Sequence, residues 1–163
     1  MIYYFSATEN SKTLALALGE RLNTKVCDMV SIVDTRQTEC RLMPDEVLGF
    51  VFPIYGWSLP NYVKDFISQL NVADYSNQYI FFAVTCGDDI GVADKHISKS
   101  LKDAGLKLNA GFSVLMPDCY INLPGFDVDK DEERKQKLAN FSVKADEISN
   151  DIKARREVMK IKR

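Results

Sequence analysis

Continuous apolar runs and amphipathic segments take turns along the chain. The runs VLGFVFPIYG (47–56) and YIFFAVTCG (79–87) are apolar at nearly every position, which is typical of strands buried on both faces of a sheet. Other segments carry apolar residues at helical spacing, as Leu14, Leu18 and Leu22 do. This alternation predicts an α/β fold: a three-layer, doubly wound domain with a five-stranded parallel sheet between helices.

The same pattern predicts the individual elements. Strands are expected at the start of the chain from Ile2 and at 24–32, 47–56, 79–87 and 110–117. Helical spacing predicts three further helices, with the apolar faces Val63, Phe66, Ile67 and Leu70; Ala93, Ile97, Leu101 and Ala104; and Leu138, Phe141, Ala145, Ile148 and Ile152. Residues 34–46 and 117–130 are expected to be surface loops. We expect one domain over residues 1–154, followed by a basic segment, 155–163, that is a helix end or a linker.

Charge is distributed unevenly between the body and the tail. From Lys153 to Arg163 there are six basic residues and one acidic residue, a net charge of +5, which leaves 15 basic and 22 acidic residues elsewhere, a net charge of −7. The tail is short and lacks interleaved aromatic residues, so a solvated helix end is favoured over nucleic-acid binding. No apolar run approaches the roughly 18 residues that span a bilayer, so no membrane partner and a cytoplasmic location are expected.

The cysteines and the single histidine do not predict a metal or nucleophilic site. Four cysteines, Cys27, Cys40, Cys86 and Cys119, are too widely spaced for a CxxC pair and are expected to be reduced thiols. Cys86 is expected to be a small residue at the edge of the core, and His96 a solvated helix residue. A phosphoacceptor domain would need an acidic residue where Phe52 and Pro53 stand, and a thiol phosphatase an arginine at Val92.

The loop SATENS, residues 6–11, is the first candidate site. Ligands of doubly wound domains bind beyond the carboxyl ends of the strands, and this loop joins a strand to a helix N-terminus, where backbone N–H groups and the helix dipole favour an anion. Its neutral donors are Ser6, Thr8, Asn10 and Ser11. Helix capping needs only one such residue, so phosphate binding is the favoured interpretation. Glu9 opposes it with a negative charge.

Two further loops share that edge of the sheet. In PIYGWSLP (53–60), Tyr55 and Trp57 flank Gly56, and they either cover a planar ring or pack on the next helix. In TCGDDIG (85–91), the side chains of Asp88 and Asp89 are expected to complement a helix dipole, while the backbone takes the functional role.

These motifs together resemble the flavodoxin-like family. The phosphate loop of that family runs [S/T]-x-T-G-N-[S/T], against SATENS here, so Glu9 replaces a glycine. The chain is most similar to the flavodoxin half of proteins in which this domain precedes a two-cluster 4Fe-4S ferredoxin, through YYFSATENS, FPIYGWSLPNYVKDFI, TCGDDIG and MPDCYINLP. The resemblance implies strand order 2-1-3-4-5 and an FMN site. The implied FMN-binding residues are Ser6, Thr8, Glu9, Asn10, Ser11, Pro53, Ile54, Tyr55, Gly56, Trp57, Thr85, Cys86, Gly87, Asp88 and Ile90, with Ile90 where many flavodoxins have an aromatic residue.

The expected function is therefore electron transfer at FMN, to or from a protein partner with an iron-sulfur centre, such as a 4Fe-4S ferredoxin. FMN would carry out the redox chemistry while the protein binds and tunes it. Two alternatives stay open: an NAD(P)H-dependent FMN or quinone reductase, and a flavin-free interaction module in which Glu9 marks a decayed loop. FMN binding requires that Glu9 tolerate the backbone conformation of the glycine it replaces, whereas the flavin-free module does not.

Overall fold

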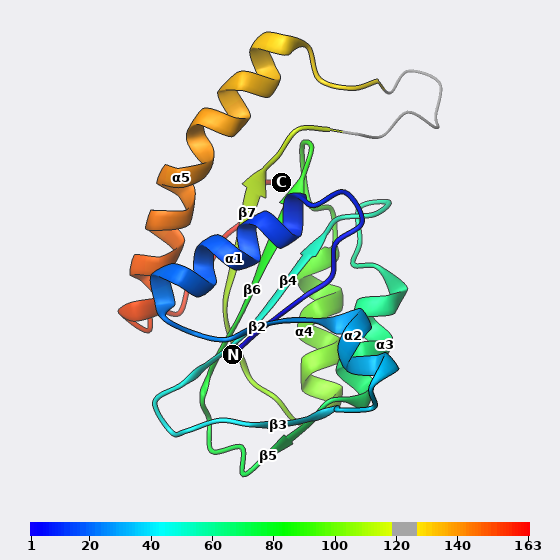
Figure 1. The fold of residues 1–163 in the computed structure, drawn as a ribbon, viewed down its shortest axis with the longest axis vertical. Coiled ribbons are helices and arrows are strands. Elements are labelled where there is room, and N and C mark those ends of the chain that lie inside the picture. Colours follow the sequence, from blue (N-terminus) through cyan, green and yellow to red (C-terminus); the bar gives the residue numbers. More distant parts are fainter. Residues whose placement is uncertain (119–126) are drawn as a thin grey trace.

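The chain forms a three-layer α/β domain in a computed structural model that describes residues 1–118 and 127–163 (Figure 1). A six-stranded parallel sheet lies in the middle, in the order β2-β1-β4-β6-β7-β8. Its strands are β1 (Ile2–Tyr4), β2 (Val26–Asp28), β4 (Val47–Pro53), β6 (Tyr79–Cys86), β7 (Leu108–Leu115) and β8 (Met159–Lys160). The first five are the predicted strands in the predicted order 2-1-3-4-5, so the expected fold class is confirmed.

Helices cover both faces of this sheet. Helices α1 (Asn10–Leu22) and α5 (Asp131–Lys153) lie on one face, while α2 (Met29–Asp34), α3 (Asn61–Gln69) and α4 (Ala93–Asp103) lie on the other (Figure 1). Each helix lies in the connection between two parallel strands of the central sheet. No helix in the described residues is long and apolar enough to cross a membrane.

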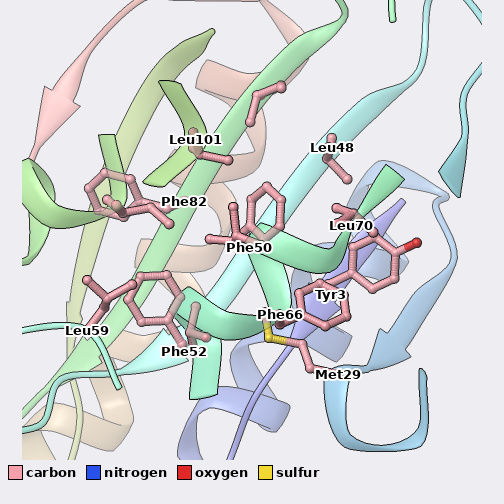
Figure 2. Packing of buried hydrophobic residues seen from close by; sticks show 14 of the residues in the cluster. Tyr3, Met29, Leu48, Phe50, Phe52, Leu59, Phe66, Leu70, Phe82 and Leu101 are labelled. Atoms are coloured by element: carbon pink, nitrogen blue, oxygen red, sulfur yellow. The ribbon is translucent and has the colours of Figure 1, made fainter. Parts of the chain in front are cut away.

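The continuous apolar runs have a simple structural cause. Side chains alternate between the faces of a strand, and β4 and β6 are covered on both faces. Leu48, Phe50 and Phe52 therefore pack against α3 and α4 (Figure 2), whereas Val47 and Val51 pack against α1 and α5. Aromatic rings fill the first cluster, with ring centroids 5.0 Å apart for Tyr3 and Phe66 and 6.4 Å apart for Phe52 and Phe82. All eight residues of β6 are buried.

Three short elements depart from the predicted pattern. The predicted strand 24–32 ends at Asp28, because the side chain of Asp28 accepts a hydrogen bond from the Val30 N–H at 3.0 Å and caps helix α2. The predicted surface loop 34–46 contains β3 (Glu39–Arg41), which pairs in parallel with β5 (Asn71–Ala73) and buries Cys40. In the predicted loop 117–130, residues 119–126, Cys119 among them, lie outside the described residues.

The basic tail does not continue the last helix. After Lys153 the chain turns back at Arg155, which has a positive φ of 52°, and forms β8 beside β7. Asp151, which is 1% exposed, pairs with Arg156 at 2.7 Å and Lys160 at 2.6 Å. The hydrogen bond from Lys160, opposed by burial and aided by Arg156, lowers the pKa of Asp151. Because β8 is parallel to β7, the C-terminus lies near the carboxyl ends of the central strands (Figure 1).

The buried face of α5 also differs from the predicted one. The predicted face began at Leu138, but Leu138 is 50% exposed and Lys137 is 8% exposed. Phe141, Ala145, Ile148 and Ile152 do lie on the packed face. Since Lys137 stands four residues before Phe141, it continues the same helical stripe, with a charged residue where an apolar one is usual.

Candidate functional site

The three predicted loops meet at the carboxyl edge of the sheet. The hydroxyl oxygens of Ser11 and Thr85 lie 2.7 Å apart, which joins the first loop to the third. The Ile54 N–H donates to the Thr85 carbonyl at 3.0 Å, and the Val92 N–H donates to the Trp57 carbonyl at 3.0 Å, which joins the second loop to the third. Parallel strands bring their carboxyl ends to one edge, and this structure places all three loops there.

Glu9 has the backbone conformation that glycine adopts easily. Its φ of 67° and ψ of −13° lie in the left-handed region, immediately before the first residue of α1. The Glu9 carbonyl accepts hydrogen bonds from the N–H of Thr13 at 2.8 Å and from its hydroxyl at 2.9 Å. These two bonds hold the strained residue in the helix-start geometry. The replacement of glycine by Glu9 therefore leaves the backbone of the loop in a glycine-type conformation.

The charge of Glu9 is paired within the loop. Lys12, one turn along α1, has its Nζ 2.7 Å from Oε2 of Glu9, and both side chains are largely exposed. The hydrogen bond and the charge of Glu9 raise the pKa of Lys12, so the lysine stays protonated. At the helix start, the negative charge of Glu9 is therefore partly offset by Lys12, so it repels an anion less than an isolated carboxylate would.

The polar side chains of this loop differ in their surroundings. The Ser6 hydroxyl is buried and has no hydrogen-bond partner in the part of the chain that the structure describes, while Thr8 is exposed. Ser11 is 1% exposed and engaged with Thr85. The side-chain amide of Asn10 donates to the Pro117 carbonyl at 3.2 Å. Ser6 is thus the hydroxyl that a ligand would satisfy, and Asn10 and Ser11 already hold the loop against neighbouring elements.

The second loop is a four-residue turn that presents two aromatic side chains. Tyr55 and Ser58 exchange backbone hydrogen bonds of 3.0 and 3.1 Å, and the central residues Gly56 and Trp57 have φ values of 54° and 58°. Positive φ at both central positions defines a type I′ turn. Tyr55 is 46% exposed and Trp57 is 53% exposed. The turn therefore holds both rings at the surface beside the first and third loops.

Contacts with neighbouring residues hold this turn in place. Gly91 has a φ of 55°, and a Cβ there would lie 2.4 Å from Cβ of Trp57, so only glycine fits. The hydroxyl of Ser58 lies 2.6 Å from Nδ1 of His96, so His96 anchors the turn to α4 as well as being exposed to solvent. The ring of Phe5 packs edge-on against Tyr55, with centroids 6.5 Å apart.

In the third loop, backbone groups are more available to a ligand than side chains are. Asp89 accepts the N–H of Gly91 at 2.7 Å and so closes the turn before α4, whose first turn carries Asp94 as its acidic residue. Asp88 is exposed. Burial, aided by the charges of Asp89 and Asp88, raises the pKa of Cys86 to about 12, so this residue is a neutral thiol at physiological pH.

Ile90 does not take the place of the aromatic residue that the resemblance implies. Its side chain is fully buried in the core with α3 and α4, so it cannot face a ligand in this conformation. Its N–H donates to the Lys162 carbonyl at 3.3 Å, which brings the tail against the loop. Only the backbone of Ile90 remains close to the candidate site.

Several residues at this edge were not predicted from the sequence. Lys162 donates its N–H to the Ser113 hydroxyl at 2.7 Å, and Arg163 pairs with Asp94 at the start of α4. Lys137 on α5 donates to the Gly87 carbonyl at 2.9 Å. The helical stripe through Phe141 could have indicated Lys137, whereas a two-residue strand such as β8 has no periodicity to detect.

Two surface hollows lie away from these loops. One, of about 410 Å³, is lined by residues such as Lys102 and Lys107, and the other, of about 310 Å³, by residues such as Glu46 and Arg155. Both lie at the amino-terminal edge of the sheet, opposite the three loops. Among the described residues, no group of three or more His, Cys, Asp and Glu side chains could hold a metal ion.

Comparisons with known proteins identify a family and a fold. A family model described as a flavodoxin domain matches residues 1–124. No curated protein sequence matches the chain. Among solved structures, the two-electron reduced flavodoxin of Megasphaera elsdenii is 17% identical, with a TM-score of 0.52 over 88% of this chain and 97% of that one.

Two further structures have the same fold. A flavodoxin of Streptococcus pneumoniae is 14% identical, with a TM-score of 0.51 over 90% of this chain and 97% of that one. An FMN-dependent NADH-azoreductase of Bacillus anthracis, solved in complex with FMN, is 9% identical, with a TM-score of 0.54 over 93% of this chain and 98% of that one. At these identities the likeness shows the fold alone.

Substitutions of Glu9 test the strain in the first loop. The left-handed conformation lowers the free energy of unfolding by about 1–2 kcal/mol at a non-glycine residue. Glycine avoids this strain, but its greater freedom in the unfolded chain lowers the free energy of unfolding by about 0.4–1 kcal/mol. We expect Glu9→Gly to raise the free energy of unfolding by up to about 1 kcal/mol, and Glu9→Val to lower it by about 1–2 kcal/mol, because β-branched residues resist this conformation. Both variants lose the Lys12 pair, so their difference isolates the backbone. Urea denaturation measures it, and equal stability of the two would contradict the left-handed conformation.

Proposed function

The chain belongs to the flavodoxin domain family, and from this premise we propose that it binds FMN at the three loops and transfers electrons to or from a protein partner. The observation that carries the proposal is the first loop. It combines a helix N-terminus, a glycine-type backbone at Glu9 and a buried Ser6 hydroxyl that has no partner among the described residues. A phosphate would satisfy that hydroxyl and the first N–H groups of α1, which have no acceptor within the helix.

The other two loops fit a flat ring. Exposed Tyr55 and Trp57 supply aromatic surface on one side, and the backbone from Cys86 to Ile90 supplies peptide groups on the other. Bound FMN would supply the redox chemistry, as a cofactor that accepts electrons singly or in pairs. The residues of this chain would hold it, with Thr85 buried beneath the loops and Pro53 and Ile54 partly exposed beside them.

Electron transfer is favoured over a reaction that needs protein acids and bases. Three titratable groups near the loops are poorly suited to such a reaction: Cys86 is a neutral thiol, Asp89 accepts a backbone N–H, and His96 is bonded to Ser58. We further propose that the partner carries an iron-sulfur centre, as a 4Fe-4S ferredoxin does, which the motif resemblance of the chain supports.

Flavin binding tests the proposal directly. We expect FMN to bind roughly a hundredfold more tightly than riboflavin, because two or more hydrogen bonds to a charged phosphate are each worth about 1.5–3 kcal/mol. Fluorescence titration of each flavin with the purified protein measures both dissociation constants. Equal affinities would remove the phosphate loop from the site, and no retained flavin after gel filtration would favour the interaction module.

Lys12 should assist phosphate binding by masking Glu9. We expect Lys12→Ala to weaken FMN binding several-fold and to leave riboflavin unchanged, because it exposes a carboxylate to the phosphate in a partly shielded site. Glu9→Gln in the same background should restore FMN affinity. The effect should shrink in about 1 M salt, where the screening length is about 3 Å. Lys64→Ala, an exposed lysine on α3, serves as the control. Unchanged FMN affinity in Lys12→Ala would show that the carboxylate does not act on the phosphate.

The electron donor separates the carrier from the reductase. We expect the flavin absorbance of the FMN-loaded protein to bleach rapidly with a reduced 4Fe-4S ferredoxin and slowly with NADH or NADPH alone, since the proposed site serves a protein partner. Stopped-flow absorbance measures both rates under anaerobic conditions. Rapid bleaching by a nicotinamide alone would assign the chain to the reductase alternative.

A further inference from the structure

Helix α5 approaches the candidate site through a lysine. Its first turns extend past the carboxyl end of β7 (Figure 1), and among residues 131–140 every residue is exposed except Lys137. Leu138, which could have packed there, is 50% exposed instead. The contact of this part of α5 with the body of the protein is therefore polar, where an apolar residue would be the default.

Lys137 has a full set of acceptors. Its Nζ donates to the Gly87 carbonyl at 2.9 Å and to Asp129 at 2.9 Å, with Glu133 3.4 Å away. The side chains of Lys137 and Asp129 are 9% and 8% exposed. Burial by itself would lower the pKa of Lys137, but the hydrogen bond and charge of Asp129 and the charge of Glu133 outweigh it and raise the pKa. The ammonium is therefore charged and held between α5 and the third loop.

Asp129 and Asp118 complete this arrangement. Oδ2 of Asp129 also accepts the N–H of Asp118 at 3.0 Å, so the carboxylate is held on two sides. The side chain of Asp118 lies against Gly87, where an added Cβ would be 2.8 Å from Oδ2 of Asp118. Gly87 is thus confined by Asp118 and fastened by Lys137 through its carbonyl.

This geometry fixes a peptide plane of the third loop. The carbonyl of Gly87 points toward α5, and since a trans peptide directs its N–H opposite to its C=O, the Asp88 N–H points away from α5. Buried ion pairs stabilise a fold poorly compared with apolar residues of similar size, so stability alone does not account for a buried lysine here. A role in orienting the loop does account for it.

We propose that Lys137, held by Asp129, is a positioning residue for the flavin-binding loop Cys86–Ile90, and that it fixes the direction of the Gly87–Asp88 peptide. This inference rests on the proposed function, because FMN binding is what gives the loop a ligand. Lys137 itself does not touch the flavin. Its effect reaches the ring end of the ligand and leaves the phosphate loop unchanged.

The test compares Lys137→Met with a double variant and a control. Asp129→Asn/Lys137→Met removes both buried charges, so it stays folded even if a single unpaired carboxylate is not tolerated. Lys135→Met makes the same change at an exposed position of α5. Circular dichroism confirms folding, titration gives the dissociation constants of FMN and riboflavin, and hydrogen exchange of the flavin-free proteins follows the amides of residues 86–91.

Loss of the charged hydrogen bond should weaken FMN and riboflavin by the same factor, about tenfold, and leave their ratio unchanged. The visible bands of the bound flavin should shift, and the Asp88 amide should exchange faster in both Lys137 variants. Lys135→Met should match the wild type throughout. The proposal would be overturned if the two Lys137 variants matched Lys135→Met in the hydrogen exchange of residues 86–91 and in their flavin affinities. A loss of affinity confined to FMN would also overturn it.

Failure of the proposed function is distinguishable from failure of this inference. If the wild type binds no flavin, the proposed function fails. Exchange in the flavin-free proteins then still decides whether Lys137 orders the loop. Faster exchange of Asp88 in both Lys137 variants supports the positioning role, and unchanged exchange overturns it.

Discussion

The burial of β4 and β6 between two helical layers is the constraint on which the rest of the structure depends. A strand covered on both faces needs apolar side chains at nearly every position and a neighbour on each side for its backbone polar groups. Here β4 pairs with β1 and β6, and β6 pairs with β4 and β7. Such strands are connected in parallel through helices, so the loops that follow them leave the same edge of the sheet. The candidate site exists because the core is built this way.

At that edge, backbone conformation defines the site more than side-chain chemistry does. Glu9, Gly56, Trp57 and Gly91 all have positive φ values, and two of them are not glycine. Each strained residue is held by a neighbour: the Glu9 carbonyl accepts two donors from Thr13, and the Trp57 carbonyl accepts the Val92 N–H. Strain of this kind persists only where the surroundings determine the conformation, and it is frequent at ligand sites. In the first loop, Glu9 has a left-handed conformation that glycine adopts easily.

Folding also removes the separation of charge that the sequence shows. The acidic body and the basic tail are interleaved in the structure, with Arg163 on Asp94 and both Arg156 and Lys160 on Asp151. The tail runs beside β7 and reaches the third loop through the Lys162 carbonyl. The rim of the candidate site therefore contains both signs of charge, and its electrostatic field depends on local pairs rather than on the net charge of −7 in the body.

The sequence by itself determined the five central strands, the helices α1, α3, α4 and α5, and the loops that meet at the carboxyl edge. Continuous apolar runs and helical spacing are local patterns that burial imposes on every residue of an element, so they can be read without the fold. Only the tertiary structure decided the elements whose stability comes from a distant partner. The two-residue strand β8 exists because β7 offers an open edge, and β3 and β5 exist because they pair with one another. Lys137 is buried because Gly87, in the third loop, and Asp129, just before α5, accept its hydrogen bonds. Glu9 is left-handed in a loop where its carbonyl accepts two hydrogen bonds from Thr13. A local pattern records which residues avoid water, but it does not record which distant group satisfies a buried charge or a strained peptide.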